Sequence, residues 1–227
     1  MRRTVTPELL DSPDCPPHEI QRSLSDLKRI NRWFGGVSTT RALIERVAAA
    51  TSKTNFSLLE VAAGHGEVPR TVAEQLARKG ISLDITDLDL APSHLQPGHR
   101  ALAADALALP FRDSSFDLVS SNLFAHHLEP DQLGAFVKEA LRISRVAVLI
   151  NDLVRHPMHL ALVYAGFPLL RSYVSRVDGV ASVRRAYIPE EMKTILASVS
   201  QNDSKPRLEI CRHYLFRMGV IIWKNNH

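Results

Sequence analysis

The segment that most constrains the fold is residues 58–66, LLEVAAGHG, in which an apolar run ends in a loop containing glycine. A helical pattern, EVPRTVAEQLARKG, follows directly. Gly64 and Gly66 let the backbone pass close to a ligand, and a helix N-terminus presents unpaired N–H groups to negative charge. These features predict a strand, loop and helix that bind a nucleotide. Later strand ends support this, because an apolar run ends at Asp89, the next at Asp105, and SFDLVSSNLFAHHL follows.

The remaining chain alternates between strand and helix patterns. Strands are predicted near 57–62, 83–88, 101–104, 116–121 and 146–151, with helical patterns between them, which indicates an α/β fold with a parallel sheet and helices on both faces. The final stretch, PRLEICRHYLFRMGVIIWK, indicates two strands joined by a short turn. Before the first strand, one amphipathic helix is predicted to stop at Gly35 and Gly36, and a second to run from Thr39 to about Ala50.

Composition limits the class of protein. A chain of 227 residues with 45% hydrophobic content suits one α/β domain. The first residues lack the apolar run of a signal peptide, and no apolar run approaches the length of a membrane span, so we expect a cytoplasmic protein with no transmembrane segment. Cys15 and Cys211 lack metal-ligand spacing, and we expect neither a disulfide nor a metal site.

The net charge of +4 does not identify a partner. The densest basic stretch runs from Lys138 to Arg185. We interpret it as solvated helix faces in preference to a patch for an anionic substrate or a membrane surface.

The segments LLEVAAGHG, ITDLDLAPSHL, ALAADALALPFRDSSFDLV and SSNLFAHHLEP resemble the class I S-adenosylmethionine (SAM) dependent methyltransferases. They are most similar to the small-molecule branch with ubiquinone/menaquinone C-methyltransferases and natural-product O-methyltransferases. The resemblance covers about residues 55–155. It implies a Rossmann-like, seven-stranded, mostly parallel sheet of order 3-2-1-4-5-7-6, with an N-terminal helical cap at 1–54 and a methyltransferase domain at 55–227. Residues 156–187 are expected to be either a core helix or a cover over the substrate pocket.

The resemblance implies SAM as the cofactor and S-adenosylhomocysteine (SAH) as its product. Asp89 ends its strand 23 residues after Gly66, where a carboxylate can accept hydrogen bonds from both ribose hydroxyls, although a helix N-cap is the alternative. Asp105 and the backbone of Ala106 are expected at the adenine, although Asp105 can also be a turn residue. Glu60, Gly64 and Gly66 match the family's acidic strand and glycine loop.

Several candidates depart from the family pattern or are only partly specified. Ala62 replaces the usual first glycine and is acceptable at a negative φ. His65 stands near the SAM tail where a small hydroxylated residue is commoner, and Asp87 is expected to form a second polar contact or a salt bridge. The remaining cofactor-binding candidates are Asn122 and Leu123 for the methionine amino group, Leu90 after Asp89, and Arg32. Arg32, with Trp33 and Phe34, would cover SAM or line the substrate pocket, and ordinary helix packing is the alternative.

The resemblance predicts methyl transfer from SAM to a small, largely apolar, aromatic acceptor such as a phenol, quinone precursor or polyketide. An RNA methyltransferase is the alternative, but SSNLFAHH replaces the [ND]PP[YF] tetrad, so we expect a small-molecule acceptor and no nucleic acid. A nicotinamide-dependent oxidoreductase is disfavoured because Pro69 stands where the third glycine is expected. Binding of SAM without catalysis is a further alternative. Sequence leaves the oligomeric state open.

The catalytic candidates are His126 and His127, which follow the fourth strand at the edge where this fold places the acceptor. Histidine has the unperturbed pKa best suited to proton removal near neutral pH. Plant phenol O-methyltransferases carry a catalytic histidine at the corresponding position. We therefore predict His126 as the general base and His127 as structural, with helix capping as the alternative for either.

Overall fold

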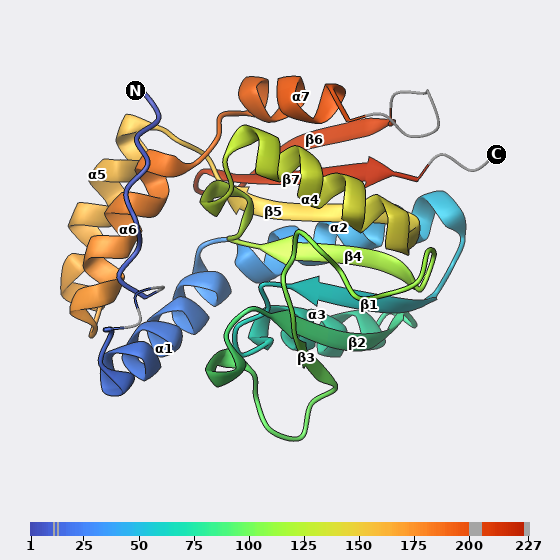
Figure 1. The fold of residues 1–227 in the computed structure, drawn as a ribbon, viewed down its shortest axis with the longest axis horizontal. Coiled ribbons are helices and arrows are strands. Elements are labelled where there is room, and N and C mark those ends of the chain that lie inside the picture. The colour runs from blue at the N-terminus through green and yellow to red at the C-terminus, as the bar shows by residue number, and fades with distance from the viewer. Residues whose placement is uncertain (11, 13, 200–205, 225–227) are drawn as a thin grey trace.

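A computed structural model describes residues 1–10, 12, 14–199 and 206–224. Its strands form one sheet of order β3-β2-β1-β4-β5-β7-β6, as the resemblance implied (Figure 1). Neighbouring strands from β3 to β5 are parallel, whereas β7 runs antiparallel to both β5 and β6. The strands are β1 (Asn55–Val61), β2 (Ser82–Asp89), β3 (Ala101–Ala103), β4 (Phe116–Asn122), β5 (Ser144–Leu153), β6 (Leu208–His213) and β7 (Arg217–Trp223).

Helices cover both faces of the sheet. The α-helices are α1 (Pro17–Trp33), α2 (Gly36–Thr51), α3 (Glu67–Ala77), α4 (Pro130–Ile143), α5 (Pro157–Gly166), α6 (Tyr173–Arg185) and α7 (Pro189–Ala197), and short 3-10 turns are η1 (Pro92–His94), η2 (Ala125–His127) and η3 (Phe167–Leu169). No helix among the described residues has the length and apolar content needed to cross a bilayer.

Alternation of apolar residues along the central strands creates two cores. Leu59 and Val119 belong to the core under α4 and α7, whereas Leu58 and Leu118 belong to the core under α2 and α3. Side chains alternate between the faces of a strand, so consecutive apolar residues bury both faces. The sheet is therefore enclosed, and a ligand can approach only its edges and strand ends.

A helical lobe stands beside the sheet, formed by α5, η3, α6 and the described part of residues 1–33 (Figure 1). Buried carboxylates join its parts. Asp178 of α6 accepts hydrogen bonds from the backbone N–H groups of Leu9 and Leu10, at 2.8 and 3.0 Å. Asp26 of α1 accepts from the backbone N–H groups of Arg171 and Ser172, at 2.9 and 3.0 Å. The N-terminal segment is thereby fixed along α6.

Two features differ from the sequence-based expectation. The sequence placed all of residues 1–54 in a cap, but α2 lies on the sheet, because Ile44 and Val47 are fully buried in the core beneath it. The second helix also begins at Gly36 instead of Thr39. Gly35 adopts φ 86° and turns the chain at once from α1 into α2; a Cβ there would lie 3.0 Å from Cγ of Arg217.

Candidate active site

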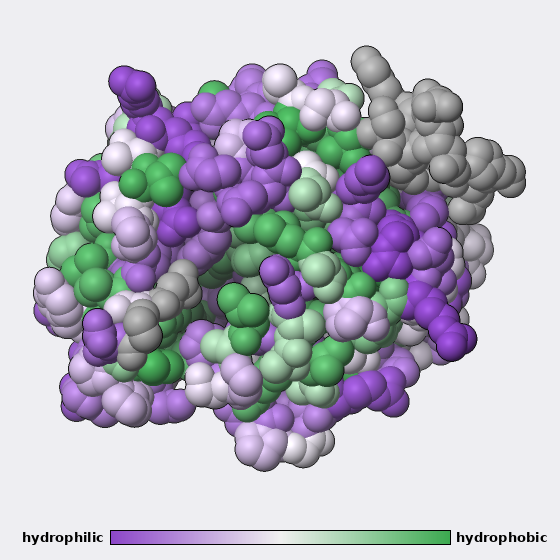
Figure 2. Space-filling model, in the orientation of Figure 1, coloured by the Kyte–Doolittle hydropathy of each residue, from purple (hydrophilic) through white to green (hydrophobic). Residues whose placement is uncertain are grey.

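A cavity of about 1170 Å³ lies between the helical lobe and the carboxyl ends of the parallel strands. Figure 2 shows its mouth as a hollow bordered by apolar side chains. Ligand pockets commonly hold about 300–1,000 Å³, so this cavity has room for a cofactor and a second molecule. The sequence-predicted residues on its wall are Glu60, Ala62, Gly64, His65, Asp89, Leu90, Asp105, Ala106, Asn122, Leu123, His126 and His127.

The loop between β1 and α3 turns through residues in the left-handed region. Gly64 and Gly66 have φ of 53° and 64°, which glycine adopts without steric cost. Ala62 has φ 54°, so the negative φ at which alanine would be acceptable here is not present. An alanine in this conformation costs about 1–2 kcal/mol, a cost that the usual glycine would avoid.

Asp89 lies at the end of β2 with its carboxylate fixed by the loop. Its Oδ2 accepts a hydrogen bond from the Gly64 N–H at 2.9 Å, and its Oδ1 accepts from the Ala91 N–H at 3.0 Å. Burial raises the pKa of Asp89, but hydrogen bonds from His94 and from these two N–H groups lower it by more. The pKa of Asp89 is therefore below its ordinary value. An ionised carboxylate offers about four acceptor positions. Asp89 can therefore hold the loop and still accept from a ligand.

Behind this loop, Glu60 of β1 is 2% exposed and contacts β4. It accepts hydrogen bonds from the Ser120 hydroxyl and from Nδ2 of Asn122, the latter at 2.6 Å. Burial raises the pKa of Glu60 to about 7, although both hydrogen bonds oppose the shift. Asn122 in turn accepts from Thr40 of α2 and Asn151 of β5. The network ties α2, β4 and β5 together at the cavity wall.

The other cofactor candidates occupy different places. Asp105 accepts a hydrogen bond from the Leu107 N–H at 2.8 Å, so it is a turn residue that also faces the cavity. Leu90 is 74% exposed at the rim. Gly66 and Arg32 are absent from the described residues that line the cavity. Gly66 lies behind the loop, where a Cβ would clash with Arg70 and Asp87.

The residues beside Gly66 and Arg32 show why neither of the two faces the cavity. Asp87 forms an ion pair with Arg70 of α3, which is the salt bridge that was one of its two expected contacts. At the end of α1, Trp33 and Phe34 line the cavity in place of Arg32. The helix end therefore contributes apolar surface to the site.

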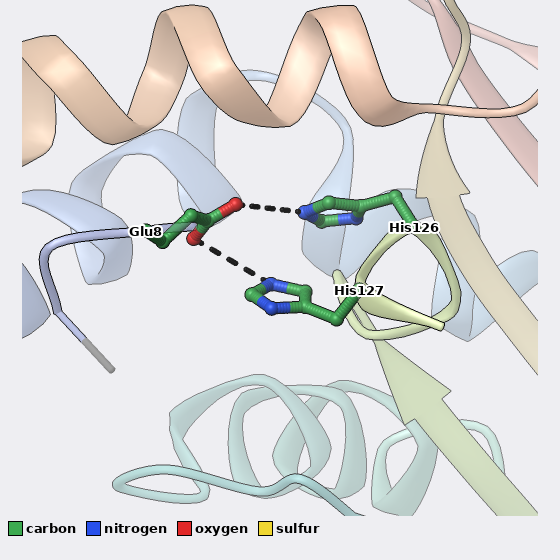
Figure 3. Close-up of side chains that lie close together, drawn as sticks. All are labelled: Glu8, His126 and His127. Carbon is green, nitrogen blue, oxygen red and sulfur yellow. Dashed lines mark ion pairs between the residues drawn. The ribbon is translucent and has the colours of Figure 1, made fainter. Parts of the chain in front are cut away.

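His126 and His127 meet Glu8 of the N-terminal segment (Figure 3). The Nε2 atoms of both histidines lie 3.5 Å from the two different carboxylate oxygens of Glu8. His126 is 2% exposed, and its Nδ1 lies 2.7 Å from Oδ1 of Asp152 on β5. Ser182 of α6 donates a hydrogen bond to Oε1 of Glu8 at 2.7 Å. The cluster joins the start of the chain to the end of β4.

This environment argues against the predicted base. Burial lowers the pKa of His126, but the carboxylates of Asp152 and Glu8 raise it more, to about 9. The imidazole is therefore protonated at neutral pH in the free chain, and it cannot accept a further proton. Our argument from the unperturbed pKa of histidine does not hold at this position.

Sequence reasoning missed Glu8, Asp152 and Arg217. Arg217 of β7 is buried and donates hydrogen bonds to the Phe34 carbonyl and to Asn31, at 3.1 and 2.8 Å. Asp152 lies near the end of the apolar strand β5, as Asp89 lies at the end of β2, and this position was the available signal. Glu8 gave no signal, because only the path of the N-terminal segment over α6 brings it to the histidines.

Known proteins resemble parts of the chain. A family model described as a methyltransferase domain matches residues 59–147. A demethylmenaquinone methyltransferase of Renibacterium salmoninarum is 30% identical over 138 residues, which make up 58% of this chain and 51% of the relative. An uncharacterized methyltransferase of Mycolicibacterium gilvum is 29% identical over 162 residues, or 64% of this chain and 62% of the relative. The chain thus spans less than two thirds of either relative.

Solved structures share the fold over most of the chain. The plantazolicin methyltransferase BamL, in complex with a triazolic desmethylPZN analog and SAH, has a TM-score of 0.70 at 12% identity, with 96% of this chain and 93% of that chain covered. A SAM-dependent methyltransferase from Aquifex aeolicus has a TM-score of 0.59 at 14% identity, with 92% and 99% covered. The matched domain, the relatives and the sheet order confirm the resemblance: residues 59–147 match a methyltransferase domain, and the chain has the fold of SAM-dependent methyltransferases.

Proposed function

We propose that the protein transfers a methyl group from SAM to a small, largely apolar, aromatic acceptor, such as a phenol, quinone precursor or polyketide. The observation that carries this proposal is the division of one cavity into two halves. Strand ends bearing Gly64, Asp89 and Asp105 form one half, here called the polar half. The helical lobe forms the other half, here called the apolar half, where large apolar side chains lie among polar residues such as Asp26 and Arg29. A cofactor in the first half and an acceptor in the second would meet inside the cavity.

In the polar half, the proposed roles follow the donor and acceptor groups present. Asp89 accepts from the ribose hydroxyls, and Asp105 with the backbone of Ala106 holds the adenine. Gly64 and His65 lie near the methionine tail, with the backbone of Asn122 and Leu123 at its amino group. The buried carboxyl of Glu60, whose pKa burial raises to about 7, lies behind this end, and a cationic cofactor would favour its ionised form.

In the apolar half, large side chains are exposed although they face the cavity. Trp33, Leu162 and Leu169 are 60%, 44% and 62% exposed. Exposed apolar surface at a cavity indicates a ligand site. A demethylmenaquinone methyltransferase among the relatives, and a structural neighbour solved with a triazolic analog, also support an organic acceptor with rings.

Transfer would proceed in line from the sulfonium to the acceptor nucleophile. The chain would supply proximity, orientation and exclusion of water. The role of His126 as general base stays a prediction, and it requires Glu8 to move away from Nε2. If His126→Ala keeps the wild-type kcat between pH 6 and 9 at saturating SAM, this base role is wrong.

Binding and turnover test the proposal separately. Isothermal titration with SAH, NAD and NADP should give saturable binding of SAH alone. Methyl-labelled SAM, incubated with phenols, quinols and bulk RNA, should label a small aromatic molecule. Binding of a nicotinamide cofactor without binding of SAH would reject the methyltransferase, and labelled RNA would favour the alternative acceptor class.

A further inference from the structure

We propose that Glu8, His126 and His127 bind a divalent transition metal ion of the Zn²⁺ type at the acceptor end of the cavity. One ligand atom from each residue lies within 4.8 Å of the others (Figure 3). Two imidazoles and a carboxylate form a frequent protein set for such ions. All three residues line the cavity.

The separations fit a shared ion. Two atoms that each lie about 2.1 Å from a tetrahedral ion are about 3.4 Å apart. The Nε2 atoms of His126 and His127 are each 3.5 Å from an oxygen of Glu8, which is longer than an ordinary hydrogen bond. The Nε2 of His126 is buried and has no hydrogen-bond partner among the described residues. An ion between the three side chains would satisfy that atom.

The surroundings supply the second layer that a metal site needs. Nδ1 of His126 is hydrogen-bonded to Oδ1 of Asp152 at 2.7 Å, and this contact directs Nε2 toward Glu8 and His127. Ligating histidines commonly hold a carboxylate in this way. Ser182 donates to Oε1 of Glu8, and Arg185 lies 3.8 Å from the same oxygen. Oε1 faces His126 and Oε2 faces His127, so the two oxygens of Glu8 would share the ion.

The site would leave at least one coordination position toward the cavity, since the described ligands number three and the side chain of His127 is 22% exposed. An open position is typical of catalytic ions. There the ion would act as a Lewis acid on an oxygen of the acceptor and favour loss of its proton. This last step rests on the proposed function, whereas ion binding does not. The proposal departs from the sequence-based expectation of no metal site, because Glu8 is remote in sequence.

Cobalt titration tests the site directly. The full-length chain, without a histidine tag and stripped with EDTA, would be titrated with Co²⁺ and then with Zn²⁺. Wild type should develop visible Co²⁺ absorption bands with one equivalent, and Zn²⁺ should displace them. Glu8→Gln and His127→Ala should each weaken Co²⁺ binding more than tenfold. The control His159→Ala, another histidine on the cavity wall, should bind as wild type does.

Glu8→Gln keeps the size of the side chain, so circular dichroism can establish folding before the titration. Absence of saturable Co²⁺ or Zn²⁺ binding to the wild-type chain would overturn the proposal and leave the cluster as an ionic tether for the N-terminal segment. Equal binding by wild type and a correctly folded Glu8→Gln would also overturn it. SAH titration of the same samples keeps this outcome separate from failure of the proposed function.

Discussion

Replacement of Glu60 by glutamine should change how stability depends on pH. Glu60 is buried, and its pKa in the folded chain is about 7 against an ordinary value of 4.5. A carboxyl with a raised folded pKa stabilises the folded chain fully below the unfolded pKa, and this stability is lost as pH rises through the folded pKa. The loss therefore falls between pH 4.5 and pH 7, and it amounts to roughly 3 kcal/mol.

The variant Glu60→Gln removes the titrating group and keeps an acceptor for Nδ2 of Asn122 and a donor toward Ser120. Its free energy of unfolding should exceed that of wild type by roughly 1 kcal/mol at pH 5 and by roughly 3 kcal/mol at pH 8. The difference grows because the wild-type carboxyl ionises at lower pH in the unfolded chain than in the folded chain. Urea unfolding at both pH values, with equal m-values, measures the difference.

The control is Glu74→Gln, since Glu74 is exposed on α3. Its free energy of unfolding should differ from that of wild type by the same small amount at pH 5 and pH 8. A constant difference between Glu60→Gln and wild type across this range would refute the reasoning, because it would mean that Glu60 does not titrate there. A loss of stability at pH 8 would show that the charged carboxylate is favourable in the fold.

Three further outcomes are expected. Asp89→Asn should weaken SAH binding in calorimetry by about 1.5–3 kcal/mol, because charge-assisted hydrogen bonds are lost. The control Asp84→Asn, toward the exposed start of β2, should leave SAH affinity unchanged. Equal SAH affinities of Asp89→Asn and wild type would show that another residue contacts the ribose. His126→Ala should lower the free energy of unfolding at pH 7 by about 3–5 kcal/mol, since Asp152 is left buried without its partner, and denaturant unfolding would show this. Hydrogen exchange should be faster in residues 157–170 than in β4, because α5 has no buried residue; equal protection would contradict a mobile cover.

The sheet was predictable because its signals are local. Runs such as LLEV and DLVSS carry their own strand pattern, and Asp89 marks a strand end by position alone. The conformation of Ala62 was not predictable, because alanine ordinarily avoids positive φ and here the surrounding turn imposes it. The same limit applied to His126: sequence placed it after β4, but its pKa depends on Asp152 and Glu8, which are distant in sequence.

Residues 156–187 show that a sequence pattern can predict an apolar helix without determining whether it is buried in the core. Their apolar run suited either a core helix or a cover. The structure places α5 on the cavity with no buried residue, while α6 buries Val174 and Val183. An apolar helix is compatible with both arrangements, and the choice depends on the partners that α1 and the N-terminal segment provide.

The choice of acceptor depends on parts of the chain outside the matched domain. Residues 59–147 contain the glycine loop, Asp89 and Asp105, and these are the groups that face the polar half of the cavity. Trp33, Leu162 and the other apolar side chains of the lobe lie outside that range. The matched methyltransferase domain thus covers the part of the cavity where the proposed cofactor binds, and it constrains the acceptor least. Substitutions in the helical lobe should therefore alter acceptor preference while leaving SAH affinity unchanged.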